Sequence, residues 1–358
     1  MKKFSFCVGN PPYQESQETT RDKPVYHYFM DAANEIADSS MLITPGKFLF
    51  NAGATPKAWN EKMLNDKNMK VMLYNPDSSS IFPNVVFPGG VAITYHDYRK
   101  DFGAIGFFST FPQVNSCLEK MKSFEYVSFS TIMYGQGSYR YTEKMHAENP
   151  GIKYNEDERG NNLGILSKGH DNDIATSALE KLDGIITFSE KPDDGHEYIK
   201  IIGRKGNERS FGYIRRDYVC DHPNLWKYKV LLSKADGAAG TIGKPVPARI
   251  TGKPVVAFPG EAHTQTFLSI GCFETKEEAE NTAKYITTKF CRFLLGALKA
   301  TQDNPPEKWK FVPLQDFTSK SDINWNTSVS NIDKQLYKKY GFSEEEIKFI
   351  ETNVKEMV

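Results

Sequence analysis

Short apolar runs alternate with amphipathic stretches through the first hundred residues of the chain. Four runs rich in β-branched, aromatic and other apolar side chains predict buried strands, at residues 3–8, 41–44, 69–74 and 90–95. Apolar side chains recur at helical spacing from Tyr26 to Ala37. A second helix is predicted with Thr55 as its N-cap and Pro56 at its first position. Strands separated by helices indicate an α/β unit with a largely parallel sheet.

The pattern changes near Phe102, where we place a domain boundary. Residues 1–101 are expected to form the α/β unit, and residues 102–358 a second, mixed α+β domain. Within the second domain, residues 184–270 contain short β-branched or aromatic runs bounded by Gly, Pro, Asp and Asn, which predict strands.

The last part of the chain, residues 275–358, is expected to be helical. Two capping-box patterns mark helix starts there, Thr275 with Glu278 and Ser343 with Glu346. The first is followed by one apolar stripe at helical spacing that reaches Leu298. This stripe predicts a single long helix.

Composition narrows the classes of function. The 358 residues carry 45 Lys+Arg and 45 Asp+Glu, and this balance excludes a protein that binds nucleic acid through a basic tail. Hydrophobic residues make up 39% of the chain, enough to build the cores of about two domains. The five cysteines are scattered and form no C-x-x-C pair, so neither a disulfide framework nor a metal site is expected.

The sequence contains no pattern that predicts secretion or membrane insertion. The longest stretch without Asp, Glu, Lys or Arg runs from Ser78 to His96, and Pro83 and Pro88 interrupt it. At the amino terminus the apolar run before Gly9 is too short for a signal peptide. We therefore expect a cytoplasmic protein.

The segment with the clearest chemical meaning is Asn10-Pro11-Pro12-Tyr13, directly after the first predicted strand. It resembles the catalytic motif of DNA amino-methyltransferases, which methylate the exocyclic amine of adenine or cytosine. The resemblance implies that the Asn10 side-chain oxygen and the Pro11 carbonyl accept the two amine hydrogens and stabilise charge that develops during attack. Pro11 and Pro12 would keep this loop rigid. Tyr13 would stack against the base once it is flipped out of the duplex. An ordinary turn is the alternative, because Asn and Pro are common turn residues.

Later segments resemble further motifs of the same family, in the same order. They are MLITPGKFLF, KVMLYNPDSSSIFPN and GGVAITYHDY. On this alignment Tyr95 occupies the place of the second aromatic residue that sandwiches the flipped base, with a core tyrosine at a strand end as the alternative. The C-terminal runs LWKYKVLLSKADG and TQDNPPEKWKFVPLQDF resemble the target-recognition regions of restriction-modification methyltransferases.

The resemblance implies a fold, a reaction and a substrate. The fold is a partial Rossmann-like methyltransferase sheet followed by a mixed α+β target-recognition domain with a helical C-terminus. The reaction is methyl transfer from S-adenosylmethionine to double-stranded DNA within a restriction-modification system. Adenine is preferred to cytosine as the target on the resemblance alone.

One feature of the family is missing from the sequence. The family binds S-adenosylmethionine through a Gly-rich turn and an acidic residue on two strands that this order of motifs places upstream of Asn10, where only nine residues stand. The glycine clusters at residues 135–137 and 237–240 do not follow a strand and open a helix as such a turn would. We therefore expect the donor-binding motif to be absent from this chain, and an upstream methyltransferase half or a restriction subunit to be its partner.

A basic stretch with interleaved aromatic residues lies between His196 and Val219. Its six candidate DNA-binding residues are Lys200, Arg204, Lys205, Arg209, Arg215 and Arg216. Such residues follow phosphates or read guanine edges. A solvated face of a β-hairpin is the alternative interpretation.

Two other functions stay open from the sequence. The chain is a non-catalytic DNA-binding specificity module, or one subunit of a split methyltransferase or restriction enzyme, if it cannot bind the methyl donor itself. A nuclease site built from Asp193, Asp194, Glu197 and Lys200 fits poorly, because period-2 alternation would direct Glu197 and Lys200 to opposite faces of a strand.

Overall fold

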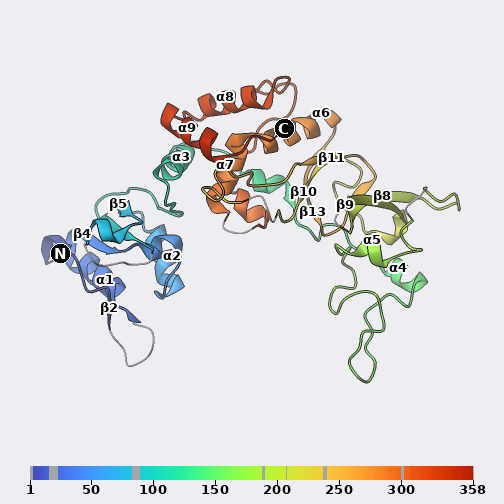
Figure 1. The fold of residues 1–358 in the computed structure, drawn as a ribbon, viewed down its shortest axis with the longest axis horizontal. Helices are drawn as coiled ribbons and strands as arrows, with labels where there is room; N and C mark the ends of the chain where they lie inside the picture. The colour runs from blue at the N-terminus through green and yellow to red at the C-terminus, as the bar shows by residue number, and fades with distance from the viewer. Residues whose placement is uncertain are drawn as a thin grey trace. The chain divides into compact units, whose positions relative to one another are not determined.

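A computed structural model describes most of the chain, which divides into two compact units, Met1–Asn115 and Ser116–Val358 (Figure 1). The described residues are 3–15, 23–82, 89–187, 190–206, 208–236, 240–299 and 302–357.

The N-terminal unit alternates strands and helices, as its apolar pattern predicts. Its elements are β1 (Phe4–Gly9), β2 (Gln14–Glu15), β3 (Lys23–Pro24), α1 (Tyr26–Ile36), β4 (Ala37–Pro45), the 3-10 helix η1 (Gly46–Phe50), α2 (Lys57–Asn65), β5 (Met69–Asn75), the 3-10 helix η2 (Ser78–Ser80) and β6 (Val91–Asp97). β4 is longer than its apolar run because Ser39 and Ser40 extend it, with hydroxyls that donate to the Ser5 carbonyl and to Asn34. α2 begins at Lys57, one residue later than expected, and the Thr55 hydroxyl donates to Asn60 instead of capping the helix.

The main sheet of this unit has the strand order β1-β4-β6-β5. β1 pairs with β4 in parallel, whereas β6 runs antiparallel to both β4 and β5. The expectation of a largely parallel sheet is therefore wrong for two of its three strand pairs. The physical reason is the connection from β5 to β6, whose described residues contain only η2, because a parallel pair needs a crossover that is usually a helix.

Among the described residues, helices cover only one face of this sheet. α1 and α2 contribute Met30, Trp59 and Met63 to a core that also contains Leu42 of β4 and, partly buried, Cys7 of β1. Since successive side chains of a strand point to opposite faces, the residues on either side of Cys7 lie on the other face.

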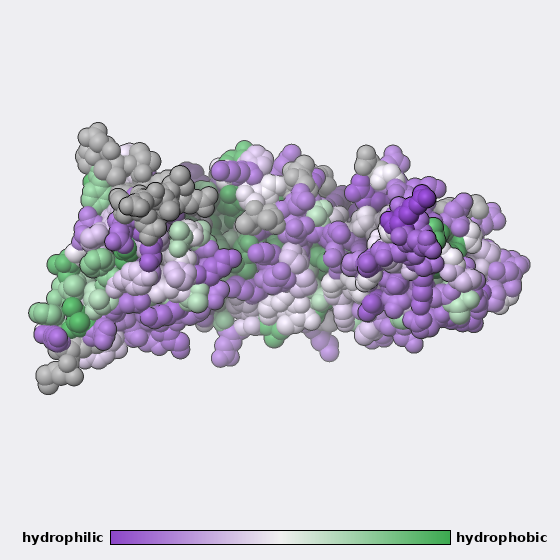
Figure 2. Space-filling view, turned by 90° about the horizontal axis from the view of Figure 1, so that it is seen from below, coloured by the Kyte–Doolittle hydropathy of each residue, from purple (hydrophilic) through white to green (hydrophobic). Residues whose placement is uncertain are grey.

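That other face carries apolar side chains that are exposed at its two edge strands in the described residues. Phe4, Phe6 and Val8 of the edge strand β1 are 56%, 50% and 71% exposed, and Met72 and Leu73 of β5 are also exposed. Hydrophobic residues accordingly gather on the surface of the N-terminal unit (Figure 2). An uncharged edge strand beside an open apolar face is a surface that proteins normally cover.

The C-terminal unit is a mixture of small sheets and helices. After α3 (Pro112–Lys122), which crosses the division between the units, its elements are the 3-10 helix η3 (Phe129–Ile132), β7 (Met133–Tyr134), α4 (Glu143–Glu148), α5 (Ala178–Lys181), β8 (Tyr198–Lys205), β9 (Glu208–Arg215), the 3-10 helix η4 (Arg216–Tyr218), β10 (Tyr228–Ser233), β11 (Val255–Ala257), β12 (Glu261–His263), β13 (Phe267–Phe273), α6 (Lys276–Thr287), α7 (Lys289–Leu298), the 3-10 helix η5 (Pro306–Trp309), α8 (Val329–Lys339) and α9 (Glu344–Asn353). The sheets have the orders β11-β10-β13-β7 and β12-β8-β9. Within this unit, Figure 1 shows α6 to α9 gathered together, away from the β8–β9 hairpin.

The C-terminal helices follow the capping patterns of the sequence with one difference. Both predicted capping boxes form, at Thr275 with Glu278 and at Ser343 with Glu346. The predicted long helix is two helices, because Thr288 adopts an extended conformation and its hydroxyl caps α7. In the described part of the chain, no helix combines the length and the apolar character that a membrane span requires.

Lys229 and His263 are among the titratable side chains that are fully buried in the C-terminal unit. The Lys229 ammonium donates to the carbonyls of Asn224 (2.9 Å), Leu225 (3.3 Å), Lys227 (3.1 Å) and Phe258 (3.2 Å), and burial lowers its pKa to about 8. His263 donates from Nδ1 to the Thr264 carbonyl at 2.9 Å, and Nε2 has no hydrogen-bond partner among the described residues.

Burial lowers the pKa of His263 to about 4, which makes the stability of this unit depend on pH. As pH falls from about 6.5 to about 4, the unfolded chain takes up a proton that the buried imidazole does not, so the folded state loses on the order of 3 kcal/mol. Urea unfolding across this pH range should show a smaller loss for His263→Gln than for the wild type. His196→Gln, at an exposed histidine, is the control, and an equal pH dependence in wild type and His263→Gln would contradict the assignment.

Candidate catalytic loop and DNA-binding hairpin

The Asn10-Pro11-Pro12-Tyr13 loop leaves the carboxyl end of β1. Gly9 pairs with Leu42 of β4, and because the two strands are parallel, their carboxyl ends lie at the same edge of the sheet. This edge is where open α/β sheets bind ligands. Asn10 is exposed, and its side chain makes no hydrogen bond to any described residue. Its amide oxygen and nitrogen are thus available to an incoming group.

Tyr13 is held from two sides. Its ring packs against the core of the N-terminal unit, and its carbonyl accepts a hydrogen bond from the Val25 amide at 3.1 Å. Burial raises the pKa of Tyr13 to about 12, so the phenol stays neutral at physiological pH. The loop therefore has a fixed end at Tyr13 and an exposed amide at Asn10.

Lys47 occupies a defined position at the same edge. It follows the carboxyl end of β4, and its aliphatic stem runs between Gly53 and Gly89. Both glycines have φ of +94°, and a Cβ at Gly89 would overlap the Lys47 stem. The packing of two glycines on one lysine depends on backbone conformation and could not have been found from composition or periodicity.

The structure does not bring Tyr95 to this loop. Tyr95 lies on β6, which β4 separates from β1. Its hydroxyl donates to Asp97 at 3.0 Å, and its ring lies 5.8 Å from the ring of Phe102. These contacts agree with the alternative interpretation, a core tyrosine near the end of a strand, and the base-stacking role of Tyr95 stays a prediction.

The basic stretch forms the β8–β9 hairpin and the turn after it, and its six residues fall into different surroundings. Arg204 and Arg209 are exposed and directly opposite each other in the strand register. The Arg209 guanidinium lies 5.4 Å from the centre of the Phe267 ring, and the two arginines bring positive charge to one place beside the turn. Exposed Phe211 lies on the same face, whereas Lys205 pairs in register with Glu208 on the other.

The remaining three basic residues have carboxylate partners. Lys200 contacts Glu261 at 2.9 Å, and Arg216 contacts Asp221. Arg215 contacts Asp217 at 2.6 Å and Glu148 at 2.7 Å, and its guanidinium hydrogen bonds help to lower the pKa of Asp217 to about 2. Three residues of the predicted set are thus exposed near the hairpin turn, and the ion pairs of the other three hold the hairpin and the following turn.

The second Asn-Pro-Pro sequence, which begins at Asn304, is part of a buried network. The Asn304 amide donates to the Ser233 carbonyl and to Asp236, and its oxygen accepts from Lys299. All of its hydrogen-bonding capacity is used inside the protein, so it holds loops together and does not offer a site.

The described residues do not form the S-adenosylmethionine site that is typical of the family, a Gly-rich turn and an acidic residue on neighbouring strands. β1, the strand that carries Asn10, is at the sheet edge, so no described strand with a Gly-rich turn lies on its free side. Gly135 and Gly137 lie in an exposed loop after β7 and open no helix, and residues 237–239 are outside the described part. These glycines therefore do not form a turn that would hold the donor in the manner of the family.

Comparison with known families supports one class of protein for the N-terminal part. Residues 1–82 match the family model described as Eco57I restriction-modification methylase. The matched segment contains β1, the Asn10 loop, β4 and β5. A search of curated proteins found no match to the chain. The match supports a methyltransferase of the restriction-modification class.

The surroundings of Arg215 generate a prediction about stability. Arg215→Gln removes the cation from two carboxylates and should lower the free energy of unfolding by about 1–2 kcal/mol, discounted for their partial exposure. Arg209→Gln breaks no ion pair with a described carboxylate and removes only a guanidinium 5.4 Å from the Phe267 ring, so it should lower the free energy of unfolding by about 0.5–1 kcal/mol, less than Arg215→Gln. Urea unfolding of both variants checks this, and equal effects would show that the Arg215 network contributes nothing.

Proposed function

We propose that this chain carries the catalytic loop and the DNA-recognition domain of a site-specific DNA methyltransferase that modifies the exocyclic amine of adenine. The observation that carries the proposal is the exposed Asn10 amide at the carboxyl end of β1, inside the segment that matches the methylase family. The preference for adenine over cytosine rests on the family resemblance alone, because the Asn-Pro-Pro-Tyr motif can serve both bases. On this proposal the N-terminal unit acts on the base and the C-terminal unit recognises the DNA.

The loop would activate the amine through hydrogen bonds that it accepts. The amine nitrogen is a weak nucleophile because its lone pair is shared with the ring. The Asn10 oxygen and the Pro11 carbonyl would hold its two hydrogens, which favours tetrahedral geometry and stabilises the positive charge that develops on nitrogen. Tyr13, fixed by the core and by Val25, would offer its ring to the flipped base.

The β8–β9 hairpin would contact the DNA backbone. Arg204 and Arg209 bring two positive charges together near the turn, and Phe211 on the same face offers an apolar surface to a sugar or base. Lys205 adds a charge on the other face of the turn. Lys200, Arg215 and Arg216 would contribute chiefly by holding the hairpin and the following turn in place.

The uncovered apolar face suggests where a donor-binding partner would pack. α1 and α2 cover one face of the sheet, and in doubly wound sheets the strands beyond a switch point carry their helices on the opposite face. A partner polypeptide could add strands to the free edge of β1 and cover Phe4, Phe6 and Val8 with helices. The Asn10 loop would then lie at the switch point of a doubly wound sheet. We assign the donor site to this partner.

A non-catalytic DNA-binding specificity module is the second candidate. The observation that favours it is the lack of fit between the described residues and the methyl donor. In that case the Asn10 loop would be an inactive remnant, and the first assay below would separate the two functions.

The catalytic role of Asn10 is tested with the full chain and a donor-binding half supplied as a mixture or fusion. Asn10→Ala should slow transfer of labelled methyl to unmethylated DNA by a factor of about 10²–10³, because one preorganised hydrogen bond is lost. DNA affinity should change little. Asn10→Asp, which keeps an acceptor, is the matched control and should retain more activity. Wild-type transfer by Asn10→Ala would show that the loop is only a turn.

The role of the hairpin is tested by the salt dependence of binding to a mixed-sequence duplex. Replacing Arg204 and Arg209 together by Gln should weaken binding and reduce the slope of log K against log salt by about 2. Replacing Lys334 and Lys338 of α8 by Gln changes the net charge equally and should leave the slope unchanged. If both double variants showed the same slope of log K against log salt, the DNA would not contact the hairpin.

A further inference from the structure

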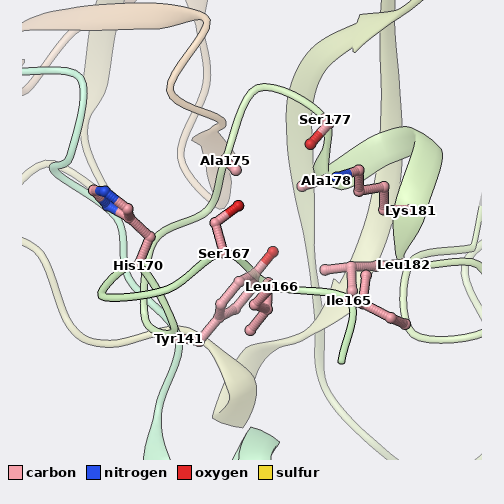
Figure 3. A pocket seen from close by; sticks show the side chains of 10 residues that line it. All are labelled: Tyr141, Ile165, Leu166, Ser167, His170, Ala175, Ser177, Ala178, Lys181 and Leu182. Carbon is pink, nitrogen blue, oxygen red and sulfur yellow. The ribbon is translucent and has the colours of Figure 1, made fainter. Parts of the chain in front are cut away.

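A pocket in the C-terminal unit lies between the loop of residues 165–170 and the helix α5. Its volume is about 30 Å³, enough for a group about as large as two waters. Half of its lining residues are apolar, and the others are Tyr141, Ser167, His170, Ser177 and Lys181. Figure 3 shows the polar ends of Tyr141, Ser167, Ser177 and Lys181 directed toward the space between the loop and the helix.

Tyr141 is the unusual member of this pocket. The residue is 2% exposed, and its buried hydroxyl has no hydrogen-bond partner among the described residues. Burying a hydroxyl without a partner costs free energy, and Phe would fill nearly the same volume without that cost. A tyrosine in this position is therefore explained by a group that enters the pocket and bonds to the hydroxyl.

The lining indicates the charge of that group. It contains three hydroxyls and the Lys181 ammonium, and no Asp or Glu is among the described lining residues. His170 is at the mouth, with a side chain that is 65% exposed and paired with Asp173 at 2.8 Å. A set of hydroxyl and ammonium donors without a lining carboxylate is typical of sites that bind phosphate oxygens.

From this geometry we infer that the pocket receives two oxygens of a DNA backbone phosphate, whose remaining atoms stay at the mouth, an assignment that rests on the proposed action on DNA. Its place in the fold supports DNA as the source. The Gly206 amide in the β8–β9 turn donates to Glu180 of α5 at 2.7 Å, and Leu179 of α5 lies against Gly203 of β8. α5 therefore links the pocket directly to the hairpin that carries Arg204 and Arg209.

Tyr141→Phe tests the inference because it should have two opposite effects. The full chain should gain stability, with a melting temperature higher by about 2–4 °C, since an unsatisfied buried hydroxyl is removed. Its affinity for a mixed-sequence duplex should fall about five- to tenfold, since one hydrogen bond to phosphate is lost. Lys181→Gln should reduce the salt slope of binding by about 1.

Tyr139→Phe is the matched control. Tyr139 is also buried, at 1% exposure, but its hydroxyl donates to Asn224 at 2.6 Å. This variant should lose stability and keep its affinity for DNA. A parallel titration with inorganic phosphate distinguishes the source of the phosphate.

Three outcomes would overturn the inference. If the Tyr141→Phe variant gains stability and keeps its affinity for both DNA and phosphate, the pocket holds only water. Weaker binding of inorganic phosphate with unchanged DNA affinity would assign the pocket to a free anion. A wild-type chain that binds no DNA would refute both this inference and the proposed function. Unchanged methyl transfer by Asn10→Ala, together with weaker DNA binding by Tyr141→Phe, would instead refute the catalytic role of the loop and support the pocket.

Discussion

The parallel pairing of β1 with β4 is the interaction on which the N-terminal unit's candidate site depends. The register runs from Phe4 opposite Ala37 to Gly9 opposite Leu42, so the chain leaves β1 beside the last third of β4. A shift of the register by one residue would move the Cys7 side chain to the exposed face of the sheet. Phe6 or Val8 would then point into the core. The exposed position of Asn10 is thus a consequence of which face of β1 is buried.

β1 also has an unpaired edge and exposed apolar side chains among the described residues. Among the described residues its backbone is paired on one side, and three of its apolar side chains are mostly exposed. Burial of such side chains stabilises a protein by about 1.5–3 kcal/mol each when it is complete. A partner that covered this face would therefore stabilise β1 and, with it, the position of the catalytic loop. Assembly and catalytic competence would be coupled through one strand.

Local patterns predicted much of this fold, and long-range packing explains what they missed. The strands and helices of the first hundred residues and both capping boxes follow from periodicity and from residue types that act within one turn. The direction of β6 and the break at Thr288 do not, because they depend on connections and on packing between distant segments. Asn10 could be recognised from the sequence because its motif is contiguous. The surroundings of Tyr95 and Arg215 could not, because they depend on partners such as Asp97 and Glu148.

Buried polar groups in the C-terminal unit separate structural from functional roles. The Lys229 ammonium donates to four carbonyls and Asn304 uses its whole amide, so both hold loops together and need nothing further. Tyr141 is buried as deeply, yet its hydroxyl is unsatisfied among the described residues and faces a pocket that adjoins the surface. Folding alone would favour phenylalanine at that position, because the ring supplies the packing and the hydroxyl only adds a desolvation cost. The free energy that the folded protein loses there would be recovered when an anion enters the pocket, which makes Tyr141 a group that stabilises the bound state at the expense of the free one.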